Sequence, residues 1–305
     1  MRYVLIANPA AGKKNPCKTV LPQIQQEFLD RGVDFTCHIT EYAGHAEQLT
    51  RMEGEKGDAV RVYGVGGDGT LREIASGAVG MENVEIGIFP YGSGDDYIRT
   101  FGGREKFLSV EKQISAESKT VDMIRSSEGL ALNLCSLGMD AAVAYNMVRF
   151  KKMPLVTGSL AYDMALVKVL CGKIGSELQI VIDDTKRYEG TYLFALAGNG
   201  KYYGGGYCGA PEAVPDDGLL DFVLIKKPKF RKIPALVGLY KAGGHLYSDK
   251  FKGILTFCRG KKINIHSKTP AVVNLDGECK IIQDVAFEMI PGAVRFLVPQ
   301  PDTQE

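Results

Sequence analysis

The strongest constraint on the fold is an alternation of two hydrophobic periodicities over the first 125 residues. Short apolar runs of strand length alternate with segments whose apolar residues recur at helical spacing, and the connections between them are short. This alternation predicts a parallel sheet with helices packed on its faces, in which ligands bind beyond the carboxyl ends of the strands. The predicted strands are 2–7, 34–40, 59–64 and 84–90, and the predicted helices are 19–32, 44–57 and 70–79.

The pattern changes after about residue 125. Short strand-like runs separated by turn signals follow, and only 140–171 looks helical in this half. Such a pattern predicts an antiparallel sandwich or barrel. The length of 305 residues also favours two domains. We expect one domain over 1–125, with 295–305 as a candidate to complete it, and a second over 126–294, packed closely with a cleft between them.

Composition excludes several classes of protein. A net charge of +1 gives no global field for nucleic acid. The seven cysteines are scattered without a C-x-x-C pair, which is typical of reduced thiols in a cytosolic protein. The amino terminus is too weakly apolar for a signal peptide, and no apolar run approaches the roughly 18 residues of a membrane span. We expect a cytoplasmic protein that meets any membrane from its surface.

The segment VYGVGGDGTLREIASG (62–77) raises the question of its ligand. Three of its glycines fit G-x-G-x-x-G, but the next strand ends at Pro90 without the acid that a dinucleotide-binding turn requires. A second interpretation is a loop whose N–H groups bind a nucleotide triphosphate while Asp68 binds Mg²⁺ or takes a proton. A third, of similar weight on pattern alone, is a tight turn in which Asp68 caps the next helix.

The run Gly66–Thr70, GGDGT after a strand, resembles the diacylglycerol kinase catalytic-domain family, which includes sphingosine and ceramide kinases. NAD kinases and phosphofructokinases share its core more distantly. Further stretches resemble the family in the same order, namely NPAAG (8–12), Thr40 before GHAEQL, PYGSGDDYIRTFG (90–102), LNLCSLGMDAAV (132–143), NGKYYGGGYCGAPEAVPDDGLLD (199–221) and LDGE (275–278).

The resemblance implies an amino-terminal three-layer α/β domain with a parallel sheet, like those of NAD kinase and diacylglycerol kinase. It also implies a mostly antiparallel carboxy-terminal β-sandwich and a kinase that transfers the γ-phosphoryl of MgATP to a lipid hydroxyl, with ATP between the domains. Diacylglycerol is the family's usual acceptor. Phosphatidylglycerol, a sphingoid base, a soluble NAD-like substrate and a catalytically degenerate binding protein stay open. The implied ATP contacts are Asn8, Thr40, Gly66, Gly67, Asp68, Gly69, Thr70 and Ser93.

The resemblance also implies catalytic and metal residues. Glu278 matches the family's general base, and Asp68 either shares that role or positions Mg²⁺. A second, structural Mg²⁺ is implied at the carboxylate of Asp217 and the carbonyls of Val214 and Leu219, oxygen ligands that suit a hard cation. One departure is Asp95, where the family usually has Asn; it adds a metal contact, weakens ATP binding or points away as a helix cap.

Two further segments have two interpretations each. The segment 226–245 interleaves six basic residues with apolar ones, which fits either an anionic membrane surface or a solvated basic face over a core stripe. The segment 159–170 fits an acyl-chain pocket or, as we prefer, a core helix. The sequence leaves the oligomeric state open, with a homodimer among the candidates.

Overall fold

The computed structural model describes residues 1–151, 153, 164–165, 167–170, 172 and 174–300. The chain forms two compact units. Unit 1 comprises Met1–Asp122 and Pro291–Glu305, and unit 2 comprises Met123–Ile290. Half of the segment 159–170 lies outside the described residues, so its two interpretations stay predictions.

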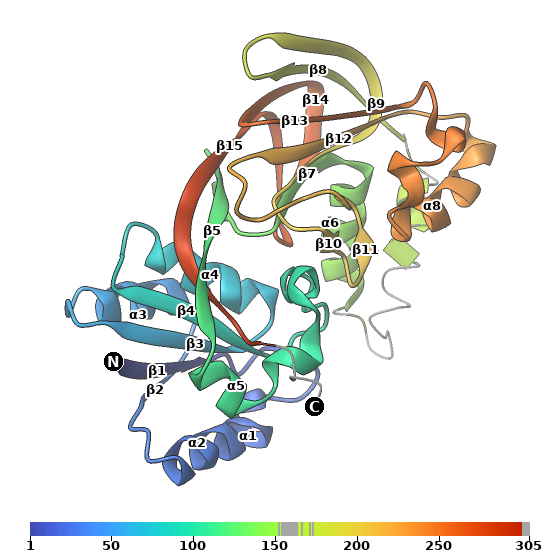
Figure 1. The fold of residues 1–305 in the computed structure, drawn as a ribbon. Helices are drawn as coiled ribbons and strands as arrows, with labels where there is room; N and C mark the ends of the chain where they lie inside the picture. Colours follow the sequence, from blue (N-terminus) through green and yellow to red (C-terminus); the bar gives the residue numbers. More distant parts are fainter. Residues whose placement is uncertain (152, 154–163, 166, 171, 173, 301–305) are drawn as a thin grey trace. The chain divides into compact units, whose positions relative to one another are not determined.

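Unit 1 contains a parallel sheet built from the predicted strands (Figure 1). Its order is β4-β3-β1-β2, and the end of β15 pairs in parallel with β4, Arg295 opposite Glu85. The strands are short and apolar because both faces of the sheet are covered. Their bounds are β1 (Arg2–Ala7), β2 (Thr36–Ile39), β3 (Val60–Gly66) and β4 (Val84–Pro90).

Helices cover both faces of this sheet, as the alternation of periodicities predicts (Figure 1). One face packs on α2 and α5, with Phe28 and Tyr63 fully buried between them. On the other face α3 and α4 pack together, and Ile74 of α4 reaches Gly64 of β3. The helices are α1 (Pro16–Thr19), α2 (Leu21–Asp30), α3 (His45–Gly54), α4 (Asp68–Ala78) and α5 (Val110–Ile114), with 3₁₀ turns η1 (Tyr97–Phe101) and η2 (Arg104–Phe107).

Unit 2 is mostly antiparallel, as expected of its turn-separated strands. A core of aliphatic and aromatic side chains lies within it, and a second apolar cluster lies beneath α8. Two of the strands, β5 (Glu117–Ser126) and β15 (Glu278–Val298), belong in part to unit 1. The others are β6 (Gly129–Ala131), β7 (Leu134–Gly138), β8 (Ser176–Ile182), β9 (Lys186–Gly198), β10 (Tyr202–Tyr203), β11 (Tyr207–Cys208), β12 (Leu220–Lys226), β13 (Leu255–Gly260) and β14 (Lys262–Leu275). The helices with described bounds are α6 (Met139–Lys151) and α8 (Ile233–Lys241), with 3₁₀ turns η3 (Phe230–Lys232), η4 (Gly244–Leu246) and η5 (Asp249–Phe251); residues 164–165 and 167–170 are also helical.

The structure corrects two expectations in this unit. First, α8 is a helix outside 140–171; its proline, Pro234, lies in the first turn, where a missing N–H costs nothing. Second, the runs before and after Pro270 form one strand, β14, because a register shift between His266 and Ala271 absorbs the interruption. The runs around Gly292 likewise join in β15. Within the described part of the chain, no helix is both long and apolar enough to cross a bilayer.

Candidate active site

Four loops meet at the carboxyl edge of the unit 1 sheet, because all four strands run in the same direction. Backbone hydrogen bonds carry the strand pairing into these loops. The Asn8 N–H donates to the Val65 carbonyl at 3.0 Å, and the Thr40 N–H donates to the Ala7 carbonyl at 2.9 Å. Asn8 and Thr40 are therefore held beside the end of β3, where the glycine loop begins.

The glycines of this loop are required by close packing. A Cβ atom on Gly67 would lie 2.7 Å from the Cα of Gly92, and one on Gly66 would lie 2.4 Å from the Thr70 hydroxyl oxygen. The Thr70 hydroxyl accepts a hydrogen bond from the Asn8 amide at 3.1 Å. Side chains at positions 66 and 67 would therefore separate the loops that follow β1, β3 and β4.

Asp68 is the first residue of α4 and connects the glycine loop to the loop after β4. Its Oδ1 accepts the N–H groups of Asp96 at 2.8 Å and Tyr97 at 3.1 Å. Gly67 is the N-cap of α4, and no side chain caps this helix, so the interpretation of Asp68 as its cap is wrong. Burial, with the negative charge of Asp96 nearby, raises the pKa of Asp68 to about 7.

Asp95 is buried and adopts a left-handed backbone conformation with φ of 49°. Its Oδ1 accepts the Gly92 N–H at 2.9 Å, and its Oδ2 lies 3.2 Å from the Arg104 guanidinium. Burial raises the pKa of Asp95, and Arg104 opposes that shift. The Asp95 side chain thus bonds within its own loop and does not point away as a helix cap. The Arg104 partner was not foreseen, because nothing in the spacing marks it.

The electrostatics of this loop fit a cation that arrives with an anionic ligand. Asp95 and Asp96 are close enough to Asp68 for their negative charges to raise its pKa. Arg104 forms an ion pair with Asp95, and Arg99 forms one with Asp96. Among the residues that the structure describes, no group of three His, Cys, Asp or Glu side chains is arranged to hold a metal ion. Mg²⁺ is commonly bound by one or two carboxylates together with substrate phosphates. The residues fit a Mg²⁺ ion that shares its ligands with a triphosphate.

The two acids of the D-G-E turn of unit 2, Asp276 and Glu278, lie in different environments. Asp276, in a left-handed conformation, accepts the N–H groups of Leu132, Asn133 and Leu134 through its carboxylate. It holds the segment before β7 against the turn, a role that sequence reasoning missed although an Asp-Gly turn is its signal. Glu278 begins β15 and is exposed.

A second acid of unit 2 lies near Glu278. The Cys279 thiol is 3.8 Å from the Ala141 carbonyl, so the first turn of α6 adjoins the D-G-E turn. The carboxylate oxygens of Asp140 in that turn are shielded from solvent, and this burial raises the pKa of Asp140 to about 6. Burial, with Asp140 and Glu278 nearby, raises the pKa of the Cys279 thiol to about 12. Asp140 lies within the segment 132–143, but sequence reasoning gave it no role.

The predicted structural Mg²⁺ residues share one turn of unit 2. The Asp217 N–H donates to the Val214 carbonyl at 3.4 Å, and the Leu219 N–H donates to the Asp217 carboxylate at 3.0 Å. The Asp217 side chain is exposed. The turn brings the three residues together, and their role as ligands stays a prediction.

The predicted ATP contacts all belong to unit 1, where the loops bring together Asn8, Thr40, Thr70 and the glycine run. Ser93 is exposed in the loop after β4, near Gly92 and Gly94 in the chain. Glu278 and Asp217 belong to unit 2.

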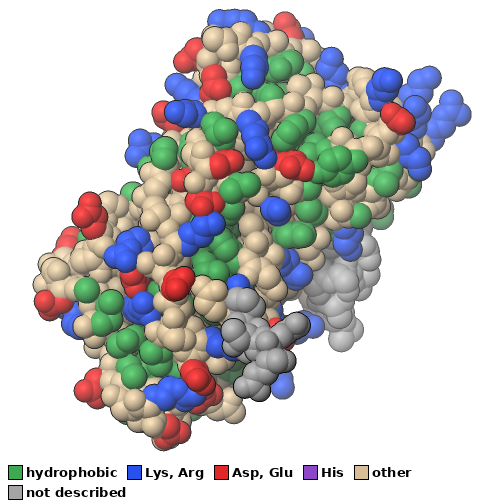
Figure 2. All heavy atoms as spheres, in the orientation of Figure 1, with side chains coloured by type: hydrophobic (Ala, Val, Ile, Leu, Met, Phe, Trp, Pro, Cys, Tyr) green, Lys and Arg blue, Asp and Glu red, His purple; other side chains and the backbone are tan. Residues whose placement is uncertain are grey.

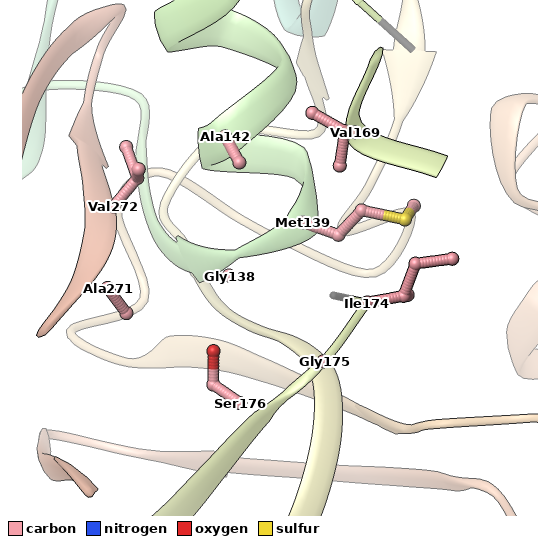
Figure 3. Close-up of a pocket in the computed structure, with 9 residues that line it drawn as sticks. All are labelled: Gly138, Met139, Ala142, Val169, Ile174, Gly175, Ser176, Ala271 and Val272. Carbon is pink, nitrogen blue, oxygen red and sulfur yellow. The ribbon is translucent and has the colours of Figure 1, made fainter. Parts of the chain in front are cut away.

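A small cavity lies beside the start of α6 in unit 2 (Figure 3). Met139 points toward Ile174 across it, and Val169, from the segment 159–170, also lines it. Its volume is about 90 Å³, less than the roughly 150 Å³ of a cavity that accepts benzene. The cavity in this form is therefore too small for an acyl chain.

Comparison with known proteins gives two matching family models. Residues 2–126 match the diacylglycerol kinase catalytic domain, and residues 133–298 match the YegS C-terminal NAD kinase beta sandwich-like domain. "Putative lipid kinase YtlR" of Bacillus subtilis is 27% identical over 90% of this chain and 93% of its own length. A relative of the same description from Staphylococcus aureus strain JH9 is 28% identical over 76% of this chain and 75% of its own length.

Solved structures share the fold. A structure described as a diacylglycerol kinase of Bacillus anthracis has a TM-score of 0.71 at 22% identity, covering 99% of this chain and 98% of its own. An NAD kinase of Archaeoglobus fulgidus in complex with ATP has a TM-score of 0.53 at 15% identity, covering 98% and 94%. The expected α/β domain and antiparallel β-sandwich are confirmed. With its GGDGT loop, its D-G-E turn and both family models matched, the chain belongs to the diacylglycerol kinase catalytic-domain family.

Proposed function

We propose that this chain is an ATP-dependent lipid kinase that transfers the γ-phosphoryl group of MgATP to diacylglycerol, giving phosphatidic acid. The observation that carries the proposal is the position of Asp68. Its carboxylate joins the glycine loop to the loop after β4, at the sheet edge where nucleotides bind in α/β folds. A turn alone would not need a partly buried acid whose pKa lies near 7.

The glycine loop and the first turn of α4 are suited to a triphosphate. Gly69 is exposed, and a Cβ there would meet no atom within 4 Å outside its own helix, so the first turn of α4 is open to a ligand and offers its positive end. Asn8 and Thr70 are held beside this loop by their mutual hydrogen bond. Ionised Asp68 would hold a Mg²⁺ ion that arrives with ATP, and that ion would supply positive charge to offset the charge of the phosphates.

In the proposed reaction the lipid hydroxyl oxygen forms a bond to the γ-phosphorus as the bond to the bridging oxygen breaks, and ADP leaves with the electron pair. Glu278 accepts the hydroxyl proton. Its exposed position at the start of β15 suits a base that meets a substrate from outside. Of the two acids in this turn, Asp276 accepts backbone N–H groups and so holds the turn, and we assign the proton transfer to Glu278.

We also propose that Asp217, with the carbonyls of Val214 and Leu219, holds a structural Mg²⁺. The turn that unites the three residues supports this, because oxygen ligands in one turn suit a hard cation.

The enzyme would work in the cytoplasm and at the inner membrane surface, where its substrate is embedded.

The acceptor is tested by incubating the full chain with [γ-³²P]ATP, Mg²⁺ and lipid alcohols in mixed micelles. Diacylglycerol, phosphatidylglycerol and a sphingoid base are compared with NAD in solution. Label in phosphatidic acid supports the proposal. Label in another lipid replaces the acceptor, label in NADP makes the chain an NAD kinase, and no label with ATP still bound makes it a degenerate member.

A further inference from the structure

The segment between β12 and α8 concentrates the positive charge of a nearly neutral chain. Residues 226–232 read KKPKFRK, in which all residues except Pro228 and Phe230 are basic. No Asp or Glu occurs from 222 to 248, whereas the whole chain has a net charge of +1. The charge is therefore local, and it lies at one edge of unit 2.

The structure separates the apolar residues of this region into two groups. Ile233, Leu236 and Tyr240 are buried in the apolar cluster beneath α8, so they form a core stripe. Phe230 is different, because 62% of its surface is exposed within the basic run. A large aromatic side chain in water among lysines contributes nothing to the core.

The basic side chains are also exposed. Within residues 1–151 and 174–300, no ion pair joins the five basic residues of 226–232 to an acid. Figure 2 shows Lys and Arg side chains gathered at the edge of unit 2 where α8 lies. An isolated cluster of like charges repels itself, and bound anions relieve that repulsion.

The start of α8 adds to the positive potential. The helix has no side-chain cap and no acid in its first turn, and Arg231 and Lys232 directly precede it. Cations are unfavourable at this end of a helix, whereas phosphate groups are favourable there. Pro234, Ala235 and Gly238 of α8 are exposed, small and uncharged, which permits close approach to a flat surface, and the exposed Lys241 at the end of the helix adds a further positive charge.

We propose that residues 226–232, with the exposed face of α8, dock this chain on an anionic phospholipid bilayer. The lysine and arginine side chains bind lipid phosphates, and the ring of Phe230 enters the acyl layer. A bilayer fits better than a nucleic acid because the surface carries one aromatic beside small apolar residues, with no series of stacking side chains. The inference rests on the proposed lipid substrate only for the reason to reach a membrane, since docking needs no turnover.

The chain contains no tryptophan, which permits a direct test. In F230W the new indole is the only one in the protein. With vesicles of phosphatidylcholine and phosphatidylglycerol, its emission should shift to the blue and be quenched by brominated acyl chains. Phosphatidylcholine vesicles alone should produce neither change. T185W, in the exposed turn between β8 and β9, is the control and should stay unquenched. That turn lies eight residues along β9 from Phe194, which packs beneath α8, or roughly 26 Å.

Charge reversal tests the basic residues. K229E/R231E should weaken binding to the anionic vesicles at least 25-fold, at roughly fivefold per charge removed. K186E/R187E, which makes the same change in net charge at the β8–β9 turn, should weaken it less than threefold. Equal losses in the two variants would overturn the proposal. So would an indole at position 230 that anionic vesicles leave unquenched, or single-stranded RNA that displaces the vesicles while no indole enters the lipid.

Kinase activity separates this inference from the proposed function. Activity on short-chain diacylglycerol in micelles, with no bilayer present, should be unchanged in K229E/R231E. If that activity is present while F230W shows no insertion, the docking surface is wrong and the kinase stands. If F230W inserts and no lipid is phosphorylated, the docking surface stands and the kinase is wrong.

Discussion

The Arg104 guanidinium lies 3.2 Å from the carboxylate of Asp95, in the part of unit 1 where a triphosphate is proposed to bind. Arg104 also lies over the ring of Tyr91, at 5.5 Å from its centre, so the guanidinium is held in place. The pair neutralises the acid that stands where the family usually has Asn. This loop therefore contains an ion pair where the family resemblance leads us to expect a neutral side chain.

The pair predicts a specific pattern in a double-mutant cycle. Arg104→Ala leaves the buried Asp95 charge without its partner, so the Kd of ATP should rise at least tenfold. Asp95→Asn keeps an acceptor for the Gly92 N–H and should change the Kd less than threefold. Combining the two substitutions should restore binding almost to the level of Asp95→Asn, as calorimetry would show. An equal defect in Arg104→Ala and the double variant would mean that Arg104 acts on ATP directly.

Asp68 predicts a pH dependence of stability in metal-free buffer. Its pKa is about 7 in the folded chain and near 4 when unfolded, so between these values the folded state holds a proton that the unfolded state has lost. The contribution of Asp68 is complete below pH 4 and is lost as the pH rises toward 7. The free energy of unfolding should fall relative to Asp68→Asn by up to about 1.4 kcal/mol per pH unit in this window.

Urea unfolding of both proteins from pH 5 to pH 8, with EDTA present, measures this difference. Adding Mg²⁺ and an unhydrolysed ATP analogue should remove much of it, because the carboxylate then has a cation beside it. Parallel pH profiles for the wild type and Asp68→Asn would show that the Asp68 carboxyl does not titrate in this range.

The two acids of the D-G-E turn should respond in opposite ways. Asp276→Ala leaves three backbone N–H groups without their acceptor and should destabilise the chain by on the order of 3 kcal/mol. Glu278→Gln, two residues away and exposed, should leave the midpoint of urea unfolding unchanged while lowering kcat at least 100-fold. Loss of activity in proportion to loss of stability in both variants would remove Glu278 from the chemistry.

The Asp217 turn predicts a metal-dependent stability that is separate from activity. Mg²⁺ at 100 times its Kd should stabilise the apo protein by about 2.7 kcal/mol. Asp217→Asn should abolish that gain, whereas Asp216→Asn, a neighbour in the same turn, should retain most of it. Thermal unfolding with and without EDTA, in the absence of nucleotide, makes the comparison. Equal gains in wild type and Asp217→Asn would place the ion elsewhere.

The alternation of periodicities was enough to predict the α/β unit, because each strand and helix there buries a local apolar pattern. The antiparallel unit was predicted as a class, but α8 and the long strands β14 and β15 were not. From the sequence alone, Pro234 and Pro270 predict the end of a helix or strand. In the structure Pro234 lies in the first turn of α8, and a register shift in β14 accommodates Pro270.

Individual site residues were easier to predict than their partners. The GGDGT motif identified Asp68. It did not identify Asp96, whose N–H donates to Asp68 from 28 residues away in the chain. The bonds from Leu132–Leu134 to Asp276 span more than 140 residues. Such contacts depend on how the chain closes, and no local spacing encodes them. For the same reason the sequence showed Asp95 as a departure without showing Arg104 as its compensation.

The measurement that tests the central claim most directly is transfer of ³²P from [γ-³²P]ATP to diacylglycerol by wild type, Asp68→Asn and Glu278→Gln, with ATP affinity measured in parallel. The wild type should form labelled phosphatidic acid. Both variants should still fold, and Glu278→Gln should still bind ATP, yet each should lose at least 100-fold in rate. If the wild type forms no labelled phosphatidic acid, or if both variants keep full activity, the account is contradicted.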